Sequence, residues 1–155
     1  MKRLRESALR LARNRDGNAM LEFAIGSSLL VMAFVGAFQF GYTFLQYNSL
    51  QNAVTRGARY ASLLPYDSTT TSPSAGFQTA VKNMVLYGSK TVGTSPALPG
   101  LTTTQVNLIV TFTNGVPSAM KVSISGYAIN SIFATSTLTN KPQVTYAYQG
   151  LWQPI

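Results

Sequence analysis

An uncharged apolar run near the N-terminus constrains this chain more than any other feature. Residues 23–45 contain no Asp, Glu, Lys or Arg, and the next charged residue is Arg56. As an α-helix they would span about 34 Å at about 1.5 Å per residue, more than the roughly 30 Å hydrocarbon core of a bilayer. In a chain of 155 residues, this run predicts one membrane-spanning helix followed by one small domain.

The charges flanking the run predict its orientation. Six of the twelve cations precede Gly17, accompanied only by Glu6 and Asp16, whereas the first cations beyond the run are Arg56 and Arg59. Cytoplasmic flanks of membrane helices carry an excess of Lys and Arg. We therefore expect a cytoplasmic N-terminus and an extracytoplasmic C-terminal domain.

The composition argues against an enzyme. The chain has no Cys and no His, and Glu22 and Asp67 are its only carboxylates after Asp16. Thiol chemistry, Ser-His-Asp catalysis, paired-carboxylate hydrolysis and the usual metal sites all lack the necessary side chains. We expect no catalytic residues, no metal and no cofactor. The six cations after Gly17 are scattered, without a basic stripe of interleaved aromatics, so we expect no nucleic-acid partner.

Glu22 lies unexpectedly at the threshold of the apolar run. An unpaired charge carried to mid-bilayer costs about 2.5–3.5 kcal/mol or more. In the stretch "DGNAMLEF", Glu22 stands five residues after Gly17 and is followed by Phe23 and Ala24. This arrangement resembles a prepilin-peptidase site, with cleavage after Gly17 and Asn18 as the new N-terminus. Glycine suits such a site, since it neither blocks a protease that needs extended backbone nor favours a helix.

Two other interpretations of the apolar run stay open. A secretory signal cleaved after a small-x-small site would use Val35 and Ala37, although its apolar region is normally only about 7–15 residues long. A permanent signal anchor explains the length and the orientation, with Glu22 as a polar residue at the membrane interface.

A longer pattern resembles the TadE-like family of minor pseudopilins from the tight-adherence (Flp) pilus system. That family has a glycine followed by Glu-Phe-Ala, an apolar helix, a glycine near the outer end of the helix, and an Ala-Arg-x-Ala motif. The resemblance covers roughly residues 15–62. Ser28 and Gln39 stand where the family commonly has a proline and an acidic residue. The corresponding residues here are Gly17, Glu22, Phe23, Ala24, Gly41, Ala58, Arg59 and Ala61.

The resemblance implies a minor pilin or pseudopilin of the bacterial inner membrane with a periplasmic C-terminal domain. Its partners would be the prepilin peptidase, other pilin or pseudopilin subunits and the pilus assembly machinery, in support of surface adherence and biofilm formation. The amine created by cleavage would pair with Glu22. The resemblance does not decide whether the protein is a major, minor or priming fibre subunit or a component of the membrane complex. Two alternative functions also stay open: a permanently anchored periplasmic scaffold of a secretion system, and a secreted binding domain released by signal peptidase.

The pattern within the helix distinguishes two faces. Leu50, Val54, Ala58 and Ala61 recur at three- and four-residue spacing, which predicts one face packed on the outer domain. We expect Arg56 to be solvated, and Arg59 to make a buried or subunit contact. Small residues in membrane helices mark close helix packing. Those expected to do so here are Gly26, Gly36 and Gly41.

Three segments and an α+β fold follow from these patterns. We expect a basic cytoplasmic leader at 1–17, a transmembrane and stem helix at 18–64, and an extracytoplasmic domain at 65–155. Within that domain, periodicity predicts a short helix at 76–89 and antiparallel strands at 105–113, 119–128 and 143–150. Val116 and Pro117 are expected to lengthen the Asn-Gly turn between the first two strands. Residues 130–142 are ambiguous between a short helix with a loop and a fourth strand.

Overall fold

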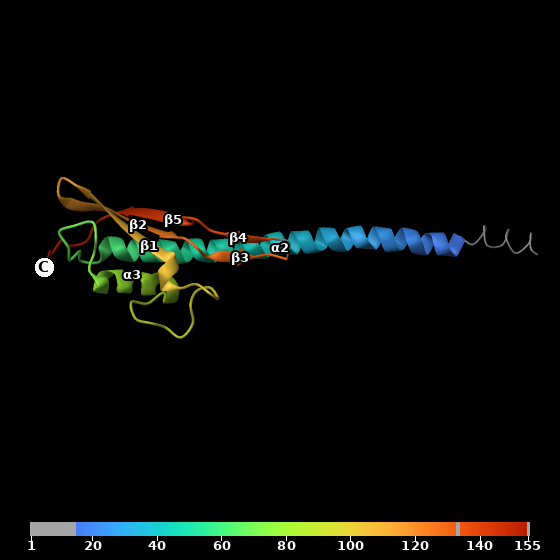
Figure 1. The fold of residues 1–155 in the computed structure, drawn as a ribbon, viewed down its shortest axis with the longest axis horizontal. Coiled ribbons are helices and arrows are strands. Elements are labelled where there is room, and N and C mark those ends of the chain that lie inside the picture. Colours follow the sequence, from blue (N-terminus) through green and yellow to red (C-terminus); the bar gives the residue numbers. More distant parts are fainter. Residues whose placement is uncertain (1–14, 133, 155) are drawn as a thin grey trace, which may run out of the picture. The chain divides into compact units, whose positions relative to one another are not determined.

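A computed structural model describes residues 15–132 and 134–154. The predicted leader therefore lies outside the described residues up to residue 14. The chain divides into two compact units, one ending at Gly41 and one beginning at Tyr42. The described part is α+β, as predicted: a long apolar helix, a short helix, a three-stranded antiparallel sheet and a separate two-stranded sheet (Figure 1).

The long helix, α2, runs from Arg15 to Leu63. Its segment from Gly17 to Leu63 is the one described helix that is long and apolar enough to cross a membrane. The helix stops just before Pro65, because a proline disfavours helical backbone at the residue before it. The end at Leu63 is one residue short of the predicted boundary at 64.

The short helix, α3, runs from Ala75 to Tyr87, as the periodicity predicted. Ser74 caps its start, where the Phe77 N–H donates to the Ser74 hydroxyl oxygen at 3.2 Å. Asp67 fixes this cap by accepting hydrogen bonds from both the N–H and the hydroxyl of Ser74. The helix therefore begins at a defined residue, and the only carboxylate after Glu22 is engaged in doing so.

The main sheet has the order β1-β2-β5 and is antiparallel throughout. Strand β1 runs from Val106 to Thr113, preceded by a short 3₁₀ turn, η1, at Thr103–Gln105. Strand β2 runs from Val116 to Ile124 and β5 from Gln143 to Ala147. The three predicted strands are thus confirmed, with β5 at one edge.

The turn between β1 and β2 is shorter than predicted. Thr113 pairs directly with Val116, which leaves a two-residue loop of Asn114 and Gly115 at φ 53° and 80°. Positive φ at both positions is the type I′ pattern that Asn-Gly favours. The expectation that Pro117 lengthens the turn is wrong, because a register shift beyond Thr111 lets the proline pair inside the hairpin.

Residues 128–130 and 135–137 form a second pair of antiparallel strands, in place of the short helix or fourth strand of the main sheet considered from sequence. Strand β3, Ala128–Asn130, pairs with β4, Thr135–Thr137, and neither joins the main sheet. β-Branched residues favour extended backbone, and a very short helix does not recover the cost of its nucleation.

One hydrophobic core joins the outer half of α2, α3 and the inner face of the main sheet. The predicted stem face is confirmed, since Leu50, Val54, Ala58 and Ala61 are fully buried. Gly57 lies where α2 packs tightly on α3: a Cβ added there would come within 2.2 Å of Val85 Cγ2. Only glycine allows this approach without rearrangement.

Tyr148 ties the C-terminal segment to the end of α2. Its hydroxyl accepts the Tyr66 N–H at 2.8 Å and contacts the carbonyl oxygens of Leu151 at 2.7 Å and Leu64 at 3.1 Å. The Tyr66 and Tyr148 rings meet edge-on with centroids 6.3 Å apart. Burial raises the pKa of both phenols above the ordinary value. The tail is anchored further where Trp152 Nε1–H donates to Ser68 O at 3.0 Å.

Candidate assembly site: the membrane helix and its stem

The first half of α2 exposes large apolar side chains along its length. Phe23, Phe34 and Phe40 are each 77% exposed. Soluble proteins rarely leave so large a contiguous apolar surface in contact with water. Lipid or neighbouring apolar helices are the environments that suit it. Further exposed members of this surface are Met20, Leu21, Ile25, Leu29, Leu30, Val31, Met32 and Phe38.

Gly17 lies within the helix. It is exposed, and apart from chain neighbours and nearby helix backbone no described atom lies within 4 Å of where a Cβ would stand. The helix is already formed from Arg15, so the backbone at Gly17 is helical and not extended. A single glycine costs a helix only about 1 kcal/mol, and the following Ala19, Met20 and Leu21 favour helix. A protease acting after Gly17 must therefore unwind the first described turn.

Glu22 is paired with an amide. Asn18 Nδ2–H donates to Glu22 Oε1 at 3.1 Å, across one turn of α2. No described side chain forms an ion pair with Glu22, so the neutral amide supplies a hydrogen bond and leaves the negative charge uncompensated. Phe23 and Ala24 beside it are exposed. The structure thus brings together Asn18 and Glu22, the two polar residues of the predicted processing motif.

The three membrane-segment glycines leave open space on the helix surface. Apart from chain neighbours and the nearby backbone of the helix itself, no described atom lies within 4 Å of a Cβ added at Gly26, Gly36 or Gly41. The neighbouring hydroxyls of Ser27 and Ser28 donate to carbonyl oxygens of their own helix, at 3.1 and 2.8 Å. This surface therefore has room for close contact with another helix, and its hydroxyls are already satisfied.

The stem motif separates into buried alanines and an exposed arginine. Ala58 and Ala61 are fully buried, whereas Arg59 between them is exposed. The alternative that Arg59 is buried within its own chain is wrong, because the helical repeat turns it away from the alanine face. Arg56 is exposed, as expected, and its guanidinium lies beside Gly88 at the end of α3. A cation there interacts favourably with the helix dipole.

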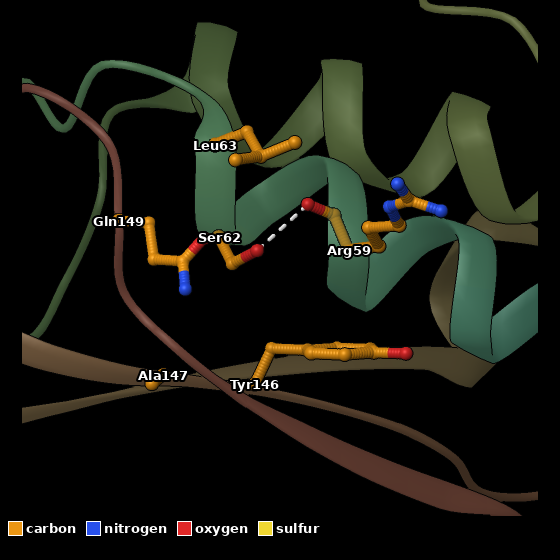
Figure 2. A pocket seen from close by; sticks show the side chains of 6 residues that line it. All are labelled: Arg59, Ser62, Leu63, Tyr146, Ala147 and Gln149. Carbon is orange, nitrogen blue, oxygen red and sulfur yellow. Dashed lines mark hydrogen bonds between the residues drawn. The ribbon is translucent and has the colours of Figure 1, made fainter.

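Arg59 borders an open pocket of about 270 Å³ between the end of α2 and β5 (Figure 2). The Gln149 N–H closes one end by donating to Ser62 O at 2.9 Å. The Ser62 hydroxyl donates back to Arg59 O at 2.8 Å, which satisfies it within the helix. The pocket is lined by Arg59, Ser62, Leu63, Tyr146, Ala147 and Gln149.

Sequence reasoning missed two parts of this arrangement. The bond from Asn18 to Glu22 could have been anticipated, because residues four apart on a helix are neighbours. The pocket beside β5 had no local signal, because it joins residues that are more than 80 positions apart in the chain. Within residues 15–132 and 134–154, no three His, Cys, Asp or Glu residues gather where they could hold a metal.

Comparison with family models finds a similarity over part of the chain. The family model described as TadE-like protein matches residues 17–59, which run from the predicted processing glycine to the stem arginine. No curated protein and no solved structure matches the chain. The resemblance stated from the sequence is confirmed over residues 17–59, where the chain is similar to the TadE-like family.

Proposed function

We propose that this protein is a minor pilin or pseudopilin that a prepilin peptidase cuts after Gly17 and that assembles through its membrane helix. Its role is structural and not catalytic. In this proposal the N-terminus is cytoplasmic, the domain after α2 is periplasmic, and assembly supports a tight-adherence pilus and thereby surface attachment and biofilm formation.

The arrangement of Asn18 and Glu22 carries the proposal. Glu22 begins an otherwise uncharged apolar surface, and its hydrogen-bond partner is the residue that cleavage would make N-terminal. Cleavage would add a positively charged amine at Asn18, one helical turn from the carboxylate. That amine, from the same or a neighbouring subunit, would supply the charge that the Asn18 amide lacks. Processing and charge pairing are then coupled.

Two alternative functions use the same helix differently. A permanently anchored scaffold would keep its basic leader and would need no amine at Asn18. A secreted domain would be cut after Ala37 and would lose the part of α2 up to that residue. Only the inner part of the TadE-like segment would then be removed. The proposal is favoured over both because it accounts for Gly17, Asn18 and Glu22 together.

Complementation of a deletion strain in the native host tests the proposal. Deletion should abolish or strongly reduce surface pili, and the wild-type gene should restore them. The variant Gly17→Leu should accumulate in membranes as uncut precursor and fail to restore pili. Gly76→Leu, at an exposed glycine near the start of α3, is the matched control and should be processed normally. Unchanged piliation in the deletion strain would refute the role in assembly, and normal cutting of Gly17→Leu would refute the processing step.

A further inference from the structure

The outer edge of β5 has unpaired backbone groups. The bonds at the two ends of this strand show which of its backbone groups face β2. The Ile124 N–H donates to Pro142 O at 3.1 Å, and the Tyr148 N–H donates to Ser118 O at 2.8 Å. Backbone groups of an antiparallel strand alternate in direction, so every second residue between Pro142 and Tyr148 also faces β2. The N–H and C=O groups that point away from β2 belong to Gln143, Thr145 and Ala147.

No described residue bonds to these outward backbone groups. The next outward group, the Gln149 N–H, is satisfied by Ser62 O, so pairing with α2 begins only where β5 has ended. Gln143, Thr145 and Ala147 are all exposed. An exposed strand edge of this kind can pair with an added strand, and proteins usually protect such edges.

The pocket beside Arg59 lies along this edge. Ala147 belongs both to the edge and to the pocket lining, and Tyr146 forms the pocket wall next to it (Figure 2). An extended segment paired with β5 would therefore place one side chain over the pocket. Arg59 is exposed at the pocket rim and makes no ion pair with any described residue.

The charges around the edge are positive. Lys121 pairs across the sheet with Thr145, and Lys141 lies two residues before β5. Residues 42–154 hold six cations and one carboxylate, Asp67, which gives 6 − 1 = +5. Asp67 is already bonded to Ser74. Within residues 42–154, the charge near the edge is therefore positive, and no side-chain carboxylate is free to bind there.

We propose that β5 pairs with an extended segment of a different polypeptide, and that an Asp or Glu of that segment binds Arg59. Backbone hydrogen bonds to an open edge give affinity, and a pocket for one side chain gives selectivity. An arginine is suited to bidentate recognition of a carboxylate. A second copy of this chain is disfavoured as the occupant, because two units of charge +5 repel each other. This inference deepens the proposed assembly role by naming the chemistry of a partner, and it rests on that role.

Site-specific photo-crosslinking of the full chain in native membranes tests the inference. A photoreactive residue replaces Ala147, and in a second strain it replaces Ile109, which is 51% exposed on β1 away from this edge. The Ala147 position should crosslink to another protein. Mass spectrometry should map the link to within about three residues of an Asp or Glu, because three residues of an extended strand span only about 10 Å. The Ile109 position should not give this product.

Two further variants separate the backbone contribution from the charge. Thr145→Pro removes one outward N–H, so it should weaken pairing with the added strand and strongly reduce the crosslink. The variant should still fold, because a proline is tolerated where the N–H does not bond within the sheet. Arg59→Gln should lower the yield roughly tenfold through loss of a charge-assisted bond. Arg56→Gln is the matched control on the same helix and should leave the yield unchanged. Unfolding followed by Trp152 fluorescence checks that each variant is folded.

Each contrary outcome overturns the inference. A crosslink to a second copy of this chain, equal products from Ala147 and Ile109, or a yield insensitive to Arg59→Gln would refute an acidic partner strand. The mature N-terminus is measured in the same membranes. A chain cut at Asn18 without the crosslink refutes this inference alone, whereas a crosslinked but uncut chain refutes the processing proposal alone.

Discussion

At the scale of single residues, Glu22 is the most informative position. Glu22→Gln keeps the shape and removes the charge, so cutting should be normal and assembly impaired. Hydrogen bonds to charged groups contribute about 1.5–3 kcal/mol, which is roughly a tenfold to hundredfold change in an assembly equilibrium. Counting surface pili and measuring precursor and mature forms on the same cells checks this. Ser28→Ala is the matched control, since the Ser28 hydroxyl bonds only within its own helix.

The charge-pairing role of Glu22 would be contradicted by wild-type pilus numbers in Glu22→Gln cells. A defect of equal size in Ser28→Ala cells would point instead to a general sensitivity of the membrane helix.

The buried phenol of Tyr148 should make the stability of the fold depend on pH. Burial raises the pKa of Tyr148, and of Tyr66 and Tyr127, above the ordinary value of 10.0. The unfolded chain therefore releases these protons first, so stability is fully present below about pH 10 and falls as the pH rises through the raised pKa values. Unfolding of the detergent-solubilised chain, followed by the fluorescence of its single tryptophan, Trp152, checks this.

The variant Tyr148→Phe separates the hydroxyl from the ring. It should lower the free energy of unfolding at neutral pH by about 1 kcal/mol and weaken the loss of stability at alkaline pH. Tyr146→Phe, at a more exposed tyrosine of β5, should change neither. An alkaline loss of the same steepness in both variants would contradict a role for the Tyr148 hydroxyl.

At the scale of elements, the contact between α2 and α3 depends on Gly57. An alanine in a helix normally adds up to about 1 kcal/mol of stability relative to glycine. At position 57 its Cβ would overlap Val85, so Gly57→Ala should instead cost about 1–3 kcal/mol. Combining it with Val85→Ala should cost less than the sum of the two single changes, because the smaller side chain removes the overlap. A stabilised Gly57→Ala variant would show that the helices do not meet there.

For the glycines of the membrane segment we expect the opposite: substitution should affect assembly and leave the stability of the outer domain unchanged. Gly36→Leu should leave the unfolding of the outer domain unchanged, because no described atom lies near an added side chain. It should reduce surface pili if this face packs closely on another subunit. Wild-type piliation in Gly36→Leu cells would contradict helix packing at Gly36.

At the scale of the whole molecule, the sequence predicts elements better than it predicts their junctions. The long run without charged residues predicted α2, and the three- and four-residue spacing of small and apolar residues predicted its buried face. Both signals lie within one continuous segment of the chain. The two-residue turn was misread, because the bulge that accommodates Pro117 forms only in the paired hairpin. Strands β3 and β4 are too short to give a periodic signal. The pocket at Arg59 joins α2 to β5, and nothing in either segment encodes that proximity.

Assembly through a processed membrane helix requires a new N-terminus, which can be measured. The full-length protein is extracted from native membranes, and its N-terminal sequence and intact mass are determined. We expect a chain that begins at Asn18, with the free amine one helical turn from Glu22. An intact Met1 would indicate a permanent anchor, and a start near Phe38 would indicate release by signal peptidase. Either result would contradict assembly through a processed membrane helix.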